Sequence, residues 1–162
     1  MSKTDTKGVI QYANDVFLRV SAYSEHQVIG QPHSLIRHPA MPRGIFHLLW
    51  ATISSGKEIF AYINNLAADG AHYWVLAHVT PSYNLDGKLV GYHSNRRSPE
   101  RSAIAVLTPL YEKMLHEETQ HRNAREAAAA SSAMLGDMLT QDGTTYEKLV
   151  WELTNRSMAD AR

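Results

Sequence analysis

The sequence predicts an α+β domain, in which short helices pack on one face of an antiparallel sheet, followed by C-terminal helices. Three observations lead to this prediction. A segment of alternating polar and apolar residues opens the chain, and a proline-interrupted segment with a helix occupies its middle. Three strand-like segments separated by Asp-Gly turns then follow, at residues 58–64, 72–80 and 89–94. From residue 98 onward the apolar residues recur every three or four positions, which is typical of helices.

The first elements are short. Residues 9–14 alternate in character and predict a strand. A strand that pairs with it should come before it, but the initiator methionine arrives almost at once, so we expect the first strand to be clipped. Asn14 can cap a short helix, and a capping box formed by Ser24 and Gln27 begins a second one. Gly30 ends that second helix.

Residues 30–50 are the most unusual stretch. Pro32, Pro39 and Pro42 each fix a backbone angle and remove a hydrogen-bond donor, so residues 31–43 should form short turns over a hollow. From Gly44 the apolar residues follow a helical spacing, and Trp50 lies on that helix. The hollow should therefore have a helical wall.

The three later strands should form an antiparallel meander. Gly70 and Gly87 mark the turns between them. Because side chains alternate along a strand, residues 73, 75, 77 and 79 should face one side of the sheet, while 74, 76, 78 and 80 face the other. One of these two sets is expected to face the hollow.

Composition excludes several classes of protein. The 162 residues are 44% hydrophobic and 20% charged, with 16 basic and 16 acidic side chains, so the charge balance does not indicate nucleic acid or an anionic membrane as a partner. The absence of cysteine excludes disulfides, thiolate metal sites and attachment of a cofactor through sulfur. No apolar run approaches the ~20 residues that span a bilayer, and no signal peptide is evident. We therefore expect a cytoplasmic protein without a membrane span.

Several segments resemble one known family. They are YANDVFLRVSAYSEHQVIGQPHSLIRHPAMP, HLLWATISSGK, DGAHYWVLAHVTP and GYHSNRRSPE, and the last leads into PLYEKML. In order and spacing they are similar to the PAS domain of the bacterial aerotaxis receptor family, from residue 3 to about residue 115. This resemblance implies a PAS fold and a redox sensor that holds flavin adenine dinucleotide (FAD) without a covalent bond. It also implies a role in aerotaxis or chemotaxis signalling, through a partner such as a chemoreceptor or kinase component, and no catalysis.

Position by position, the resemblance places five residues at or near the cofactor: Asn14, Arg37, His38, Trp50 and Asn65. A guanidinium can contact phosphate, an amide can contact the flavin ring edge, and an indole can form an aromatic wall. Each residue also has a simpler interpretation. Asn14 could serve only as a helix cap, Trp50 could be ordinary core, and Arg37 with His38 could lie in a solvated loop.

The sequence also departs from the family pattern. Ala40 replaces an acidic residue, Ile59 replaces a tryptophan, and Leu66 with Ala67 replaces a basic pair. His93 adds a ring that the family site lacks. These departures keep two alternatives open, a haem-binding PAS sensor and a ligand-free PAS module for interaction or dimerisation. The chain has nine histidines, but their spacing matches no metal motif.

The organisation expected from the sequence has three parts. Residues 1–98 form the PAS sensory domain, 99–141 a helical extension for signalling and dimerisation, and 142–162 a C-terminal amphipathic helix. We expect helix across residues 116–130, and a capping box formed by Thr144 and Glu147. The apolar faces of these helices must pack on the domain, on each other or on a second copy, and a homodimer is expected. No catalytic constellation is recognisable, so the chain is expected not to be an enzyme.

Overall fold

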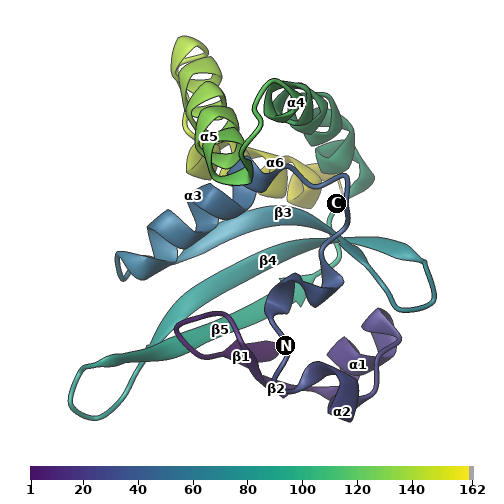
Figure 1. Cartoon of the computed structure of the whole chain (residues 1–162). Coiled ribbons are helices and arrows are strands. Elements are labelled where there is room, and N and C mark those ends of the chain that lie inside the picture. Colours follow the sequence, from purple (N-terminus) through teal and green to yellow (C-terminus); the bar gives the residue numbers. More distant parts are fainter. Residues whose placement is uncertain (161–162) are drawn as a thin grey trace.

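The computed structural model describes the backbone of residues 1–160 and the side chains of residues 1–155. Its centre is a five-stranded antiparallel sheet with the strand order β2-β1-β5-β4-β3 (Figure 1). The strands are β1 (Ser2–Thr4), β2 (Ile10–Ala13), β3 (Ile59–Leu66), β4 (His72–Tyr83) and β5 (Leu89–Arg97). This arrangement confirms the predicted α+β fold and the meander of β3, β4 and β5.

The first strand differs from the prediction. Residues that pair with the 9–14 segment do precede it, because β1 lies between β2 and β5 and pairs with both. The three residues of β1 are too few to show an alternating pattern, and they escaped notice for that reason. Ser2, at the start of β1, is fully buried.

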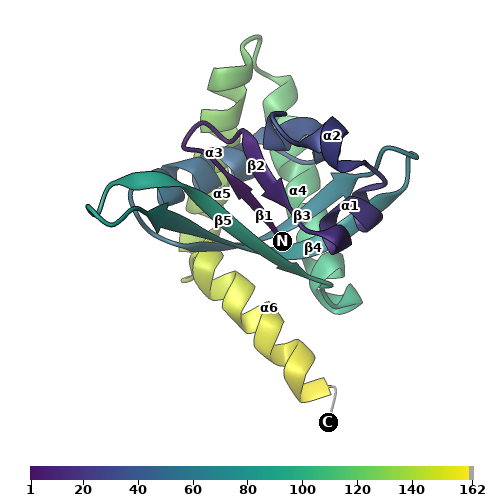
Figure 2. The same ribbon diagram turned by 90° about the horizontal axis from the view of Figure 1, so that it is seen from below.

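Short helices on one side of the sheet follow the predicted order (Figures 1 and 2). They are α1 (Asp15–Ser21), α2 (Glu25–Val28), the 3-10 turn η1 (His33–Ile36) and α3 (Arg43–Ser54). The Ser24 and Gln27 capping box is present, and Gly30 adopts a positive φ of 82° just after α2. The proline-rich segment contains only the short η1 turn before α3 begins, as predicted.

The C-terminal part forms three helices: α4 (Arg101–Thr119), α5 (Ala124–Gln141) and α6 (Tyr146–Asp160). The helix expected across residues 116–130 is wrong, because the chain turns between α4 and α5. Asn123 caps α5 by accepting a hydrogen bond from the Arg125 amide at 2.8 Å, which supports a new helix start within a strongly helical sequence. The C-terminal helix was predicted to extend to residue 162, and residues 161–162 lie outside the described part of the chain.

The cap of α6 is displaced by one residue from the prediction. The Thr145 hydroxyl accepts from the Lys148 amide at 3.3 Å, and the Thr145 carbonyl accepts from the Leu149 amide at 2.9 Å. Gly143, with φ of 70°, makes the preceding turn as expected. The spacing favoured Thr144, because Glu147 follows it by three residues, but the helix begins one residue later and Thr145 takes the capping position.

The apolar faces of α4, α5 and α6 pack within the same chain. Most of their buried residues belong to one core cluster with α3, β3 and β4. The members from the C-terminal helices are Ala103, Leu107, Tyr111, Met114, Leu135, Leu139, Tyr146, Val150 and Leu153. α5 packs against α3, and α6 packs against β3 and α4. The reason from which the homodimer was expected therefore does not hold, and the homodimer stays a prediction.

A close junction joins α3, α4 and α5 at Gly44. A Cβ atom added at Gly44 would collide with the Ser131 hydroxyl and lie 2.7 Å from the Ser132 backbone nitrogen. The Glu118 carboxylate of α4 accepts from the Gly44 amide at 3.0 Å and from the Ser131 hydroxyl at 2.7 Å. The small residues Gly44 and Ser131 thus let α5 approach α3 closely.

Two tyrosine hydroxyls occupy the free edge of β3. Tyr111 donates to the Tyr62 carbonyl at 2.8 Å, and the Tyr62 amide donates to the Tyr146 hydroxyl at 3.3 Å. The two hydroxyls also bond each other at 2.8 Å. Further along the edge, the Asn64 carbonyl accepts from the His38 amide at 3.4 Å. The edge strand is thereby tied to α4, α6 and the proline-rich segment.

Candidate functional site

A cavity of about 290 Å³ lies between α3 and the inner face of the sheet. Val75, Ala77 and Val79 of β4 line it, which identifies the inward set of the two predicted alternatives. Phe46, Leu49, Trp50 and Ile53 of α3 form the opposite wall. The volume is at the lower end of the ~300–1,000 Å³ typical of ligand pockets. The site therefore suits a flat apolar group held between a helix and a sheet.

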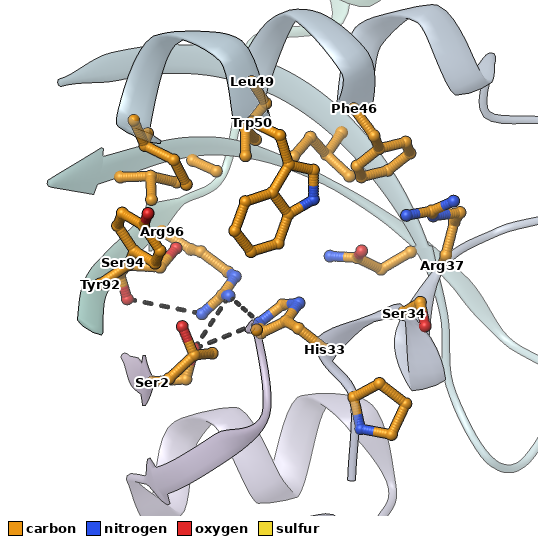
Figure 3. Close-up of a pocket in the computed structure, with 18 of the residues that line it drawn as sticks. Ser2, His33, Ser34, Arg37, Phe46, Leu49, Trp50, Tyr92, Ser94 and Arg96 are labelled. Carbon is orange, nitrogen blue, oxygen red and sulfur yellow. Dashed lines mark hydrogen bonds between the residues drawn. The ribbon is translucent and has the colours of Figure 1, made fainter. Parts of the chain in front are cut away.

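One end of the cavity carries a cation without a carboxylate partner. The Arg96 guanidinium lies deep in the cavity, where it donates to the Ser2 hydroxyl at 3.0 Å and to Nε2 of His33 (Figure 3). Among the described residues, the ion pairs within 4 Å join only histidine to glutamate, at His78–Glu58 and His121–Glu117. Arg96 is therefore a buried positive charge that only neutral groups of the described chain satisfy.

Burial lowers the pKa of Arg96 to about 10, which still leaves the guanidinium protonated at neutral pH. Burial and, second, the charge of Arg96 lower the pKa of His33 to about 3. The His33 ring is consequently neutral at physiological pH, and its Nε2 can accept from Arg96. This end of the cavity thus presents one fixed positive charge, which favours negative charge on a ligand.

The other end of the cavity is formed by Arg37, whose guanidinium stacks on the Phe46 ring at 3.8 Å from its centroid. Nε of Arg37 and Oγ of Ser94 are buried, and neither has a hydrogen-bond partner among the described residues. Asn65 contributes an amide to the same cavity. A ligand with polar edges could supply the hydrogen-bond partners that these buried atoms lack.

Three of the five predicted site residues meet in this cavity. Arg37, Trp50 and Asn65 line it, and Figure 3 shows the Trp50 indole over the space between Arg37 and the Arg96–His33 pair. Trp50 also contacts Tyr92 edge to face, with ring centroids 5.6 Å apart. These positions agree with an aromatic wall, a cation and an amide, while their contact with a cofactor stays a prediction.

Asn14 and His38 are not among the cavity-lining residues. Asn14 caps α1, because its Oδ1 accepts from the Phe17 amide at 3.1 Å and also binds the N-terminal ammonium group. Nδ1 of His38 accepts from the Ala40 amide at 3.0 Å, and the His38 ring lies 5.7 Å from that of His72. The simpler interpretation of Asn14 as a cap thus matches its observed role.

Sequence reasoning missed the polar end of the site. Tyr92, Ser94 and Arg96 alternate along β5 and face the cavity. The predicted strand ended at Ser94, so Arg96 fell outside it, although the period of two would have placed Arg96 on the same face. His93 lies on the opposite side of β5, with its pKa lowered by burial and by Lys3. The extra ring at position 93 therefore does not line the cavity.

The residues present fit a flavin better than a haem. The apolar walls and the Trp50 ring suit a planar aromatic system, and Arg37, Asn65 and Ser94 offer polar atoms to its edges. Of the nine histidines only His33 lines the cavity, and its Nε2 is engaged by Arg96 rather than free to ligate iron. Among the described residues, no group of three or more His, Asp or Glu side chains is placed to hold a metal ion.

An antiparallel five-stranded sheet, with helices that close a cavity over one face, is the architecture of a PAS domain. The family model of the PAS fold matches residues 10–96, and the chain belongs to this family. The expected relation to the aerotaxis receptors is confirmed as well. The aerotaxis receptor of Escherichia coli strain K12 is 38% identical over 122 residues, which are 75% of this chain and 24% of the receptor.

Other relatives are regulatory or sensory proteins. The nitrogen fixation regulatory protein of Klebsiella pneumoniae is 33% identical over 97 residues, which cover 60% of this chain and 20% of that protein. The light-state structure of the blue-light photoreceptor Aureochrome1 LOV has a TM-score of 0.61 at 22% identity, and the match covers 67% of this chain and 87% of that one. The chain thus spans about a quarter or less of these two curated relatives, while the photoreceptor shows the fold alone.

Proposed function

We propose that this chain binds FAD non-covalently and relays its redox state to a signalling partner, such as a chemoreceptor or kinase component, without catalysing a reaction of its own. One observation carries this proposal: the cavity combines the Trp50 wall with a buried Arg96 that pairs with no carboxylate of the described residues. The resemblance to aerotaxis receptors supports a flavin as the ligand. Since the chain has no cysteine, a thioether or thiol adduct to the flavin cannot form.

The visible spectrum of the purified chain tests this proposal. After incubation with excess FAD and removal of unbound ligand, we expect flavin absorption that is bleached on reduction and restored by oxygen. A featureless spectrum would instead favour the ligand-free interaction module, and a Soret band would favour haem. Flavin, when bound, supplies the redox chemistry. The chain supplies the apolar walls, the amide of Asn65 and the positive charge of Arg96.

Replacing Trp50 should weaken ligand binding while leaving the chain folded. Trp50→Ala removes the aromatic wall, and we expect the FAD dissociation constant to rise at least about tenfold. The loss of packing against Tyr92 should lower the free energy of unfolding by about 3 kcal/mol. Flavin fluorescence titration and urea unfolding measure the two effects. Exposed Trp151, replaced in the same way, is the control and should leave FAD affinity unchanged.

Arg96 should set the redox potential of the bound flavin. A positive charge in the cavity stabilises the more negative reduced ligand, so Arg96→Gln should lower the midpoint potential. An effect of about 1–2 kcal/mol corresponds to roughly 20–45 mV for a two-electron couple. Arg97→Gln, on the neighbouring exposed position of β5, is the matched control. An equal shift in both variants would assign the effect to net charge rather than to the cavity.

The relay to the C-terminal helices is proposed to run through β3. Asn65 faces the cavity from β3, and three residues earlier Tyr62 bonds Tyr111 of α4 and Tyr146 of α6. A change in hydrogen bonding at Asn65 would move a strand that both helices contact. We expect amide hydrogen exchange in α4 and α6 to differ between oxidised and reduced protein, and this difference to disappear in Asn65→Ala. Identical exchange in both redox states of the unmodified chain would contradict the relay.

A further inference from the structure

A second cavity adjoins the first. It is a groove of about 430 Å³ between α3 and α5, and Arg37, Phe46 and Trp50 line both spaces. Its remaining walls include Arg43 and His47 from α3 and Ala124 and Ala128 from α5. A ligand that fills the inner cavity and passes Arg37 would therefore enter this groove. The α5 wall lies outside residues 10–96, which the PAS family model matches.

The groove is electropositive. Arg37 and Arg43 are close enough for the charge of Arg43 to contribute, after burial, to lowering the pKa of Arg37. The charge of Glu118 raises the pKa of Arg37, but the Glu118 carboxylate already accepts hydrogen bonds from the Gly44 amide and the Ser131 hydroxyl. No carboxylate among the described residues lies within 4 Å of either arginine. Buried Nε of Arg37, which has no partner, points to an acceptor that the described chain does not supply.

We propose that the groove between α3 and α5 holds the phosphate-bearing half of a flavin dinucleotide, so that α5 forms one wall of the ligand site. This inference rests on the proposed flavin function and adds where the phosphates lie. Two guanidinium groups suit a pyrophosphate, because each can form charge-assisted hydrogen bonds to it. The small side chains of Ala124 and Ala128 leave the space that the rest of the nucleotide would occupy.

Three probes separate the ring site from the groove: riboflavin, which lacks phosphate, flavin mononucleotide and FAD. We expect FAD to bind the full chain at least about tenfold more tightly than riboflavin, with the mononucleotide between them. Ala128→Trp fills the groove and should weaken FAD about tenfold or more, while riboflavin binding stays the same. Ala129→Trp places the same ring on the exposed side of α5 and is the control.

A charge variant gives an independent readout if Ala128→Trp disturbs the packing of α5. Arg43 is exposed, so Arg43→Gln should leave the fold intact and weaken FAD about fivefold, without changing riboflavin affinity. Arg19→Gln makes the same change of charge on α1, which does not line the groove, and should change the affinity for neither FAD nor riboflavin. Thermal unfolding without ligand confirms that each variant is folded.

The outcomes distinguish the two proposals. If FAD and riboflavin bind equally tightly, or if the groove variants change both affinities alike, the groove is not the phosphate site, although the flavin function stands. If none of the three flavins binds the unmodified chain, the flavin function fails and the inference fails with it. A selective loss of FAD affinity in both Ala128→Trp and Arg43→Gln supports the inference.

Discussion

Gly44→Ala is expected to destabilise the folded chain by about 2–4 kcal/mol. The added methyl group would collide with the Ser131 hydroxyl, and it would lie 2.7 Å from the backbone nitrogen of Ser132, which no side-chain rotation can move. Overpacking of this kind usually costs ~1–3 kcal/mol. A further loss is expected because separation of α3 from α5 would break the hydrogen bonds that Glu118 makes to Gly44 and Ser131. Urea unfolding followed by circular dichroism measures the change.

Gly136 provides the matched control. It lies in α5, and no atom is within 4 Å of the position that its Cβ would take. Gly136→Ala should therefore stabilise the chain by about 0.5–1 kcal/mol through helix propensity. Opposite signs for the two substitutions would show that the α3–α5 contact is as close in solution as in the structure. Equal small effects would mean that α5 does not dock on α3.

Alkaline pH should unfold the chain through two buried tyrosines. A tyrosine in an unfolded chain has a pKa of about 10. Burial is the main cause that raises the pKa of Tyr146 to about 12 and that of Tyr111 well above its ordinary value. The folded state therefore keeps protons that the unfolded state releases. The stabilisation is complete below pH 10 and is lost as the pH rises toward 12, by about 2–3 kcal/mol for Tyr146.

The free energy of unfolding at a series of pH values from 8 to 11.5 tests this expectation. Tyr146→Phe should already be less stable at pH 8 by about 1–3 kcal/mol, because the Tyr62 amide loses its acceptor. Its stability should then fall less steeply above pH 10. Tyr12→Phe removes an exposed tyrosine and should leave the slope unchanged. An unaltered slope in Tyr146→Phe would show that other groups control alkaline unfolding.

Local patterns predicted the sheet and the helical wall, because alternation and prolines act over a few residues. Trp50, Arg37 and Asn65, which line one cavity, were named by the family resemblance, and their contact with a cofactor stays a prediction. Local patterns did not reveal the Arg96–His33–Ser2 cluster, since its members come from three separate segments that only the folded sheet brings together. Nor did they show where the apolar faces of α4–α6 pack, because a sequence pattern does not distinguish a partner in the same chain from one in a second copy.

The residues at the edge of β3 determine how far the chain can be shortened. Without α4 and α6, the Tyr62 amide and carbonyl would become an open site for strand addition. Residues 1–98 alone, although they contain the whole matched PAS region, would also expose the apolar core residues that these helices cover. Such a fragment should aggregate, so its visible spectrum would not report whether the intact chain binds flavin. A shortened chain must therefore keep α4 and α6, because these helices cover both the edge of β3 and the apolar core.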